Sequence, residues 1–321
     1  MQLAKSAMLV SVTIINGGLL GERRDSKASE LVENSFNVQH RRTKASKYLI
    51  DRKHKSVKRV IAASQRVREV VYRFTLPWGD DKLRLLPVKT AEQFRYAISN
   101  ATTELEDART EYIRNYPALV AQSEQDLAEL FDATQYPGKD EIGALFKTKI
   151  NYWPMPESGH FMADISEGAA KEAKQAIEAE IEERLIEATY DMVRRAKDVV
   201  TSFLDKLEST DTEPKTNDWG DVTGQKIQGV LRDSLIDNIT DTANLIEKMN
   251  LTESSQIKKV VKDLRRLSGY SADGWRRYPM RYERDRPGAI TAAQEILTNL
   301  QMLDMRDQEI ESMVSDGGEY M

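Results

Sequence analysis

The chain of 321 residues contains no cysteine and only three histidines, His40, His54 and His160. The absence of cysteine excludes disulfide bonds and thiolate metal sites, and it agrees with a reducing cytosol. The histidines are too scattered for a zinc site or a catalytic triad. No run approaches the roughly 18–20 apolar residues that span a bilayer. We therefore expect a cytoplasmic protein whose histidines are ordinary polar residues.

Phosphate-binding and metal-binding motifs are also lacking. Gly17-Gly18-Leu19-Leu20-Gly21 is followed by Glu22 and Arg23, whereas a P-loop needs lysine and then serine or threonine. Glu180, Glu183 and Glu187 share a helical face, but that segment has no histidine for a di-metal site, so a solvated acidic face is the better interpretation. We predict no catalytic, cofactor-binding or metal-binding residue, and hence no enzyme.

What the chain does have is a long helical repeat over residues 166–208. Apolar residues recur there every three or four positions, from Ala170 through Ile181 and Met192 to Leu207, with charged residues between them. This period is typical of an amphipathic helix. A helix of that length cannot bury its own apolar stripe, so other segments must pack along it. We therefore take this helix as the element around which the fold is organised.

The remaining pattern predicts a mainly α fold of the α+β class. Alternating apolar residues indicate strands near 8–15, 147–153 and 161–165, which form a small sheet; a signal peptide is the alternative for the first of them. We predict a helical domain with this sheet and the long helix over 1–208, a flexible polar loop over 209–224, C-terminal helices over 225–314 that pack back on the long helix, and a disordered tail over 315–321.

Proline positions predict where helices begin and end. Trp78 should lie under a tight loop between Pro77 and Pro87. Pro117 should break or kink the helix that starts near residue 88, and Pro287 should open the last helix. Residues 225–249 should form a further helix, and Thr252 or Ser254 should cap the next one.

Basic residues are concentrated in one N-terminal segment, although the chain as a whole has a net charge of −5. Between residues 41 and 73 there are twelve lysines and arginines but only two acidic residues, Asp51 and Glu69. Such an asymmetry indicates an interaction surface. The candidate contacts of this first basic patch are Arg41, Arg42, Lys44, Lys47, Arg52, Lys53, Lys55, Lys58, Arg59, Arg66, Arg68 and Arg73.

A second basic patch interleaves aromatic rings with arginines near the C-terminus, a combination that single-stranded nucleic acid binding requires. Its candidate contacts are Lys258, Lys259, Lys262, Arg265, Arg266, Trp275, Arg276, Arg277, Tyr278, Arg281 and Tyr282. Two alternatives remain: both patches dock on the acidic helical segments 104–131 and 166–208 within the fold, or they bind an acidic protein partner.

Several fragments carry a resemblance to a known family. They are Trp78-Gly79-Asp80 with Arg84-Leu85-Leu86-Pro87, Asn115-Tyr116-Pro117, Pro154-Met155-Pro156 and Leu231-Arg232-Asp233. In order and spacing the chain resembles an uncharacterised family of phages and integrative elements, filed as domain of unknown function 3150, over roughly residues 8–300. The family has no established activity. The resemblance implies a MoxR-like AAA ATPase and a von Willebrand A-like protein as partners in DNA metabolism, because their genes often neighbour the family's own. It also implies the host cytoplasm if a phage encodes the chain.

Three functional hypotheses follow. The leading one is a non-enzymatic, helical, coiled-coil-like adaptor of a phage or other mobile element, acting with the AAA ATPase. The second is a single-stranded nucleic-acid-binding protein that uses the patches at 41–73 and 258–286. The third is a virion or assembly component, and each of the three hypotheses is compatible with an oligomer.

Overall fold

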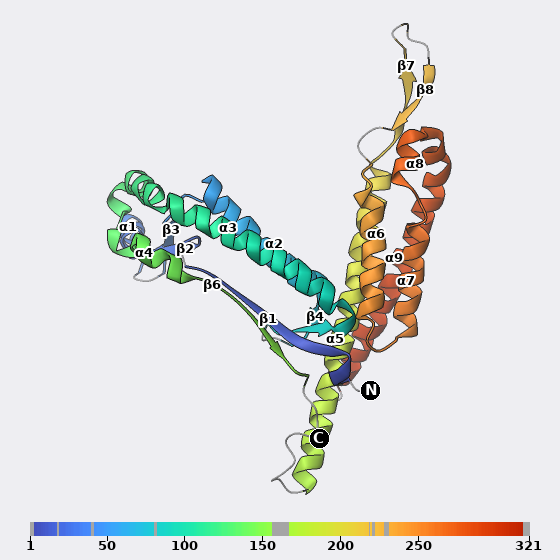
Figure 1. Ribbon diagram of the computed structural model, residues 1–321, viewed down its shortest axis with the longest axis horizontal. Coiled ribbons are helices and arrows are strands. Elements are labelled where there is room, and N and C mark those ends of the chain that lie inside the picture. Colours follow the sequence, from blue (N-terminus) through green and yellow to red (C-terminus); the bar gives the residue numbers. More distant parts are fainter. Residues whose placement is uncertain are drawn as a thin grey trace. The chain divides into compact units, whose positions relative to one another are not determined.

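The computed structural model describes residues 3–17, 19–39, 42–79, 82–155, 167–217, 219, 222–227 and 231–316 (Figure 1). The fold is mainly α with a few antiparallel strands, as predicted. The chain forms two compact units. Unit 1 comprises the described residues of 1–8, 75–90 and 154–321, and unit 2 comprises those of 9–74 and 91–153. The long helix thus belongs with the C-terminal helices, whereas the sequence pattern grouped it with the N-terminal part.

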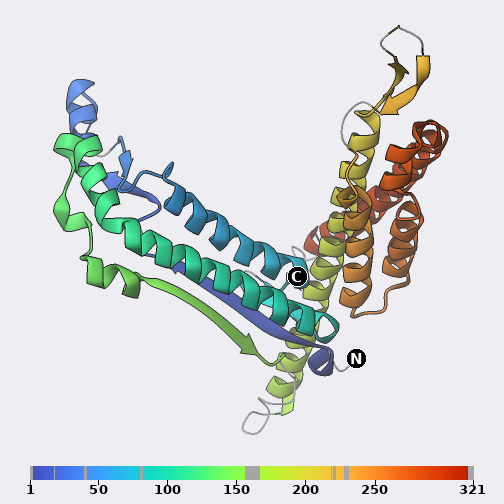
Figure 2. The same cartoon turned by 45° about the horizontal axis from the view of Figure 1, so that its top comes forward.

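Unit 1 is built on helix α5 (Glu167–Glu208), which confirms the predicted long helix. Helices α6 (Ser234–Met249), α7 (Ser255–Leu267) and α9 (Pro279–Asp316) pack along it, side by side in Figure 2. Their apolar residues repeat at helical spacing and are buried between the helices, as Ile246 in α6 and Leu264 in α7 illustrate. Ser254 caps α7 by accepting a hydrogen bond from the backbone N–H of Ile257, as predicted.

Trp78 lies in a short hairpin of unit 1, formed by β4 (Leu76–Pro77) and β5 (Arg84–Pro87). The ring is buried, as expected, and the Arg184 guanidinium of α5 lies 5.5 Å from its centroid. Gly79 has a φ of +71°, and a Cβ there would lie 2.0 Å from the Arg184 Nη1. The positive φ therefore favours glycine in this turn, and any larger residue would also displace the Arg184 guanidinium.

The prediction of a polar loop at 209–224 is wrong. Much of this segment forms a β-hairpin, which extends beyond the helix ends in Figure 1. Strand β7 (Thr212–Thr216) pairs antiparallel with β8 (Val222–Ile227). Threonine and valine favour extended backbone, and an ion pair of 2.8 Å joins Lys226 to Glu213 across the ribbon. The helix predicted over 225–249 consequently begins only at Ser234.

The last helix was expected to open at Pro287, but α9 begins at Pro279 and runs through Pro287 without a break. A proline in the first turn costs nothing, since its missing N–H would have no partner there. Next to Pro287, Arg286 ties α9 to the end of α5 by donating to the carbonyl oxygens of Leu207 and Glu208. Short helix α8 (Ala272–Arg277) precedes α9.

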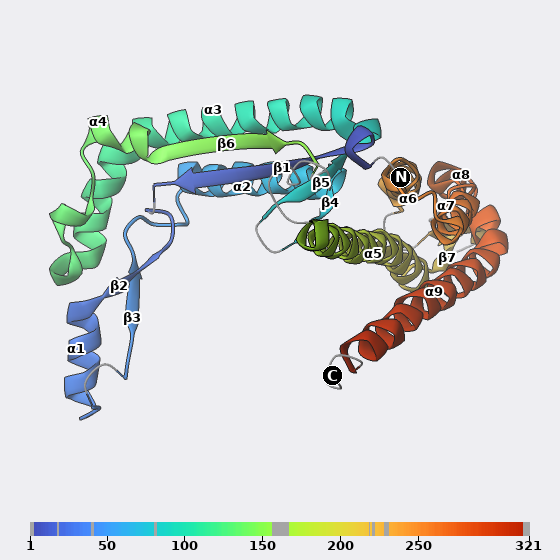
Figure 3. The same cartoon turned by 90° about the horizontal axis from the view of Figure 1, so that it is seen from below.

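Unit 2 contains a long antiparallel pair, β1 (Ala7–Asn16) and β6 (Phe146–Trp153), flanked by the helices α2 (Lys55–Phe74) and α3 (Val88–Leu127) (Figure 3). Both strands were predicted; the third, at 161–165, lies outside the described residues. Arg109 of α3 is buried and reaches Thr148 Oγ1 at 2.7 Å and Asn16 Oδ1 at 3.1 Å. It ties the helix to both strands.

Helix α3 contains Pro117 and is continuous there, so a break is excluded; the alternative, a kink, agrees with the change of direction of α3 toward its C-terminal end in Figure 3. The helix is held on both sides of the proline, because Tyr116 and Leu119 are buried and the Tyr116 hydroxyl donates to the carbonyl oxygen of Pro137 at 3.0 Å. Short elements then lead to β6, namely η2 (Ala128–Leu130), η3 (Ala133–Gln135), α4 (Lys139–Ile142) and η4 (Gly143–Leu145); η1 (Leu3–Lys5) precedes β1.

At one end of unit 2, a small module joins β2 (Glu22–Asp25), α1 (Ser26–Ser35) and β3 (Ala45–Tyr48) (Figure 3). β2 pairs antiparallel with β3, so that Arg23 faces Lys47 and Arg24 faces Ser46. The Tyr136 hydroxyl donates to the carbonyl oxygen of Leu49 just after β3, which attaches the module to the segment that follows α3. We call residues 22–48 the ββα module.

Candidate functional site

The second basic patch is largely neutralised inside unit 1. Arg276 contacts both carboxylate oxygens of Asp233, at 2.8 and 2.9 Å, and donates to the carbonyl oxygen of Leu231. The other paired cations bind acids nearby in the same unit: Lys258 to Glu253, Arg265 to Glu247, Arg266 to Glu295, Arg277 to Asp273, and Arg281 and Arg284 to Asp285. Six of the eight basic candidates therefore have an acid partner, and three of these pairs, those of Arg265, Arg266 and Arg276, join different structural elements.

Two rings of the second patch cannot stack on bases, which corrects that prediction for Trp275 and Tyr282. Both have an exposed fraction of 0% and pack against each other edge-on, with their centroids 5.4 Å apart. The Tyr282 hydroxyl donates to the carbonyl oxygen of Thr210, and burial raises its pKa. Tyr278 is the exposed ring among the three aromatic candidates.

The acid that anchors this aromatic cluster is Asp285. Partial burial raises the pKa of Asp285, but hydrogen bonds from the Trp275 indole N–H and the Arg284 guanidinium lower it by more, so the net shift is downward. Asp285 therefore carries its charge at neutral pH. Its role is to satisfy a buried indole and two neighbouring arginines, one of which is Arg281.

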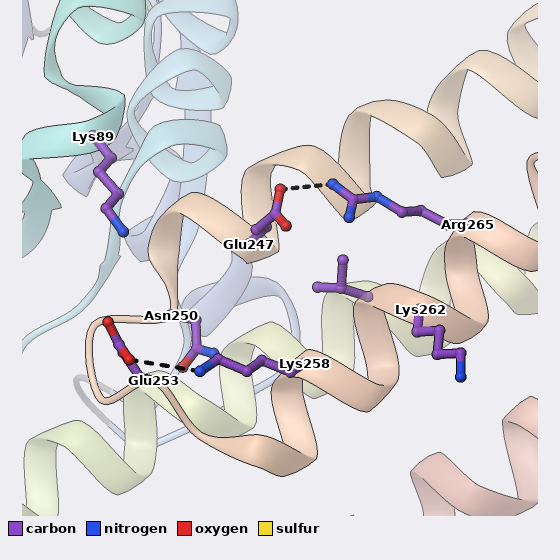
Figure 4. A pocket seen from close by; sticks show the side chains of 8 residues that line it. Lys89, Glu247, Asn250, Glu253, Lys258, Lys262 and Arg265 are labelled. Atoms are coloured by element: carbon purple, nitrogen blue, oxygen red, sulfur yellow. Dashed lines mark hydrogen bonds and ion pairs between the residues drawn. The ribbon is translucent and has the colours of Figure 1, made fainter.

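A cavity of about 350 Å³ between α6 and α7 gathers three candidates of the second patch (Figure 4). Its charged lining is Lys89, Glu247, Glu253, Lys258, Lys262 and Arg265. Two ion pairs, Arg265 to Glu247 at 2.6 Å and Lys258 to Glu253 at 3.6 Å, account for both acids. Lys89 and Lys262 make no ion pair with a described residue, so the cavity has a modest excess of positive charge.

The first basic patch is different, because α2 exposes nearly all of its cations. Its buried face is Val57, Val60, Val67 and Val71, and its exposed face contains Lys55, Lys58, Arg59, Arg66, Arg68 and Arg73 with Glu69 as the one acid of the helix. Arg59 pairs with Glu111 of α3, and Arg66 pairs with Glu69 at 3.5 Å within α2. Lys55, Lys58 and Arg68 form no ion pair with any residue that the structure describes. This exposed face is the α2 basic stripe.

Outside α2, the candidates of the first patch are divided. Arg42, Lys44, Arg52 and Lys53 are exposed, and Arg41 lies outside the described residues. Lys47 is buried, forms an ion pair of 2.7 Å with Asp25 and donates to the carbonyl oxygen of Leu130. Lys47 is therefore structural, which corrects its assignment as a contact for nucleic acid or an acidic partner.

These ion pairs test in part the hypothesis that the two basic patches pack on the acidic segments 104–131 and 166–208 within the fold. In the described chain, acids of 104–131 take up one cation of the first patch through Arg59 and Glu111. The second patch is neutralised mainly by acids of α6, α8 and α9, and not by the acidic face of residues 178–187. The acids of α5 in that face bind their own helix instead, since Lys174 pairs with Glu178 and Arg184 pairs with Glu180.

Sequence patterning missed two apolar surfaces. No residue from 171 to 187 of α5 is buried, although Ile177, Ile181 and Leu185 continue the apolar stripe of the helix. In the ββα module, Leu31 and Phe36 are exposed. The first surface could not be found from spacing alone, because a buried and an uncovered apolar stripe have the same period.

Comparison with known proteins gives no further guidance: no family model, no curated protein and no solved structure matches the chain. Among the residues that the structure describes, no group of three or more His, Cys, Asp or Glu side chains is placed to hold a metal ion. Within the same part of the chain, every helix is too short or too polar to cross a lipid bilayer.

Proposed function

We propose that this protein is a non-enzymatic, helix-rich accessory protein that works by binding other proteins, with a MoxR-type AAA ATPase of a phage or mobile element as its partner. The ATPase comes from the sequence resemblance. The observation that supports a protein contact is the first half of α5, where residues 171–187 contain no buried side chain. Apolar stripes at helical spacing are the usual means by which one helix binds another.

The chemistry of this surface suits a helical partner. Ile177, Ile181 and Leu185 are only partly covered, and Ile186 beside them is 42% exposed. Burying such side chains in an interface contributes about 25 cal/mol for each Å² of apolar area removed from water. Exposed glutamates such as Glu178 border the stripe and select a partner with basic residues at its rim.

The test is co-purification of the full chain with the AAA ATPase encoded beside its gene. We expect the wild-type chain to elute with the ATPase, and Ile181→Glu to lose the complex because a carboxylate then lies in the apolar contact. Glu183→Gln is the matched control on the same helix and should retain binding. Failure of the wild-type chain to bind the ATPase, with both proteins folded, would contradict the proposal.

A second candidate function, single-stranded nucleic acid binding, is favoured by the α2 basic stripe. Its six exposed cations lie along one helix of 20 residues, and Tyr72 on the same helix is 57% exposed. A backbone-following row of positive charge with an accessible ring meets the two requirements for binding a single strand.

Fluorescence anisotropy with a labelled thymidine oligonucleotide tests this candidate. If α2 binds the strand, affinity falls with salt, and Lys58→Ala with Arg68→Ala lowers the salt slope by about 0.7 for each phosphate contact removed. Arg265→Ala, which removes a cation already paired with Glu247, should leave the slope unchanged. No binding by the wild-type chain at low salt would eliminate this candidate.

A further inference from the structure

Helix α1 of the ββα module has a polar buried face. Ser29 donates to the backbone oxygen of Asp25 at 2.6 Å and accepts from the N–H of Ala45 at 3.0 Å. Glu33 accepts from the N–H and the hydroxyl of Thr43. Asp25 caps the helix through the N–H of Ala28 and pairs with Lys47. Side chains that usually face water thus attach α1 to the strands.

The apolar residues of α1 face outward instead. Leu31 is 62% exposed, Val32 is 38% exposed, and Phe36 at the end of the helix is 75% exposed. Val32 and Phe36 are four residues apart and are therefore neighbours on the helix surface, and the exposed Leu31 precedes Val32 on the same helix. A cluster of large apolar side chains on the outside of a helix marks a binding surface more often than isolated exposed residues do.

The charge around this cluster is positive on balance, because two of the four acids of the module are buried and its exposed cations outnumber its two exposed acids, Glu22 and Glu30. Asp25 and Glu33 are buried in the contacts above, and Glu22 accepts from the Tyr48 and Ser46 hydroxyls. Four cations, in contrast, are exposed and form no ion pair with a described residue: Arg23 and Arg24 on β2, and Arg42 and Lys44 before β3. The electrostatic potential at the surface of the module is therefore expected to be positive.

From this arrangement we infer that α1, with Leu31, Val32 and Phe36 at its centre and Arg42 and Lys44 at its edge, is a docking surface for an acidic amphipathic helix of a partner protein. This inference rests on the proposed function in one respect, that the chain binds other proteins. The surface itself is separate from the α5 surface. Apolar side chains of the partner cover the exposed cluster, and its carboxylates pair with the surrounding cations.

The probe is a fluorescent synthetic peptide made of repeats of Leu-Glu-Ala-Leu-Leu-Glu-Gln, which forms an acidic amphipathic helix. We expect it to bind the full chain, with affinity reduced about tenfold or more by Phe36→Asp or Leu31→Asp, because each places a charge in the centre of the contact. Arg42→Glu with Lys44→Glu should weaken binding in a salt-dependent manner. The same peptide with lysine in place of glutamate should not bind.

Tyr96→Asp is the matched control, since Tyr96 is also a highly exposed aromatic residue of unit 2 but lies on α3. It should bind the acidic peptide as wild type does. Equal binding by Phe36→Asp, or equal binding of the lysine peptide, would overturn the inference. So would Phe36-dependent sedimentation with phosphatidylglycerol vesicles, or Phe36-dependent self-association in light scattering, since the occupant would then be a lipid surface or a second copy. Retention of the AAA ATPase complex by Phe36→Asp separates this outcome from failure of the proposed function.

Discussion

The two basic patches look alike as counts of lysine and arginine, yet the fold uses them differently. In unit 1, arginines such as Arg276 and Arg286 are taken up by acids and helix carbonyl oxygens. In unit 2, the α2 basic stripe has one acid on its own helix, and several of its cations have no ion pair in the described chain. Positive charge indicates a binding surface only where the same segment lacks the acids that would neutralise it.

The largest effect should come from the aromatic centre of the second patch. Trp275→Ala removes a fully buried ring and leaves Asp285 without the indole donor, so we expect the free energy of unfolding to fall by about 3–5 kcal/mol. Urea denaturation followed by circular dichroism measures it. Tyr278→Ala, at an exposed ring of the same segment, should change stability little; an equal loss in both variants would refute the structural role assigned to Trp275.

Lys47 should behave as a core residue although it belongs by sequence to the first patch. Lys47→Met leaves the buried carboxylate of Asp25 without its cation, at a cost of about 3 kcal/mol. Lys44→Met, at an exposed neighbour, is the control and should cost less than about 0.5 kcal/mol. A loss of similar size in both variants would contradict the claim that Lys47 stabilises the fold through its ion pair with Asp25.

The same pair predicts a pH dependence. Hydrogen bonds from Lys47 and from the N–H of Ala28 lower the pKa of Asp25 below its ordinary value of 3.8. A carboxylate with a lowered folded-state pKa stabilises the fold above its unfolded pKa, and that contribution is lost as the pH falls through the lower folded value. Wild type should therefore lose stability below about pH 4, and Lys47→Met should lose less over the same range. Parallel curves for the two proteins would contradict this account of Asp25.

Arg276→Ala should have an intermediate effect. The guanidinium binds Asp233 and the carbonyl oxygen of Leu231, and the Asp233 hydrogen bond raises its pKa further. Because Arg276 is solvated, we expect a loss in the free energy of unfolding, measured by urea denaturation, that is smaller than the loss caused by Lys47→Met. Arg276→Lys should restore only part of it, since a lysine cannot hold both carboxylate oxygens and the carbonyl together.

The smallest effect on stability should come from the α2 basic stripe. Arg68→Ala removes an exposed cation that has no ion pair in the described chain, so thermal unfolding should change by less than about 0.5 kcal/mol. A large loss there would mean that α2 is held by its charges, and the contrast between the two patches would disappear.

Much of the fold follows from local pattern. The long helix α5, the strands β1 and β6, the Trp78 turn and the Ser254 cap were all predicted from apolar period and turn chemistry. The errors occur where packing between distant segments decides the outcome. Pro117 and Pro287 lie inside continuous helices because contacts on both sides of each proline hold the helix together. Propensity near a proline cannot reveal such contacts.

The candidate surfaces were harder to predict than the fold. Trp275 and Tyr282 carry the same ring types as a base-stacking platform, and only burial identifies them as core. The ββα module is the opposite case. By residue type Leu31 and Phe36 would be assigned to the core, but Ser29 and Glu33 occupy the buried face of the helix. In the ββα module the chain inverts the ordinary assignment of polar and apolar residues, and the hydrogen bonds that Ser29 and Glu33 make with Ala45 and Thr43 permit it.

The difference between the two patches can be measured on the intact chain by arginine modification with phenylglyoxal and peptide mass spectrometry. The side chain of Arg66 is 59% exposed, whereas those of Arg276 and Arg286 are 35% and 25% exposed and engaged in hydrogen bonds. We predict that Arg66 and Arg68 are modified first and that Arg276 and Arg286 react only slowly. Equal rates, or faster modification of Arg276 than of Arg66, would contradict the claim that Arg276 and Arg286 are part of the fold whereas Arg66 lies on the surface.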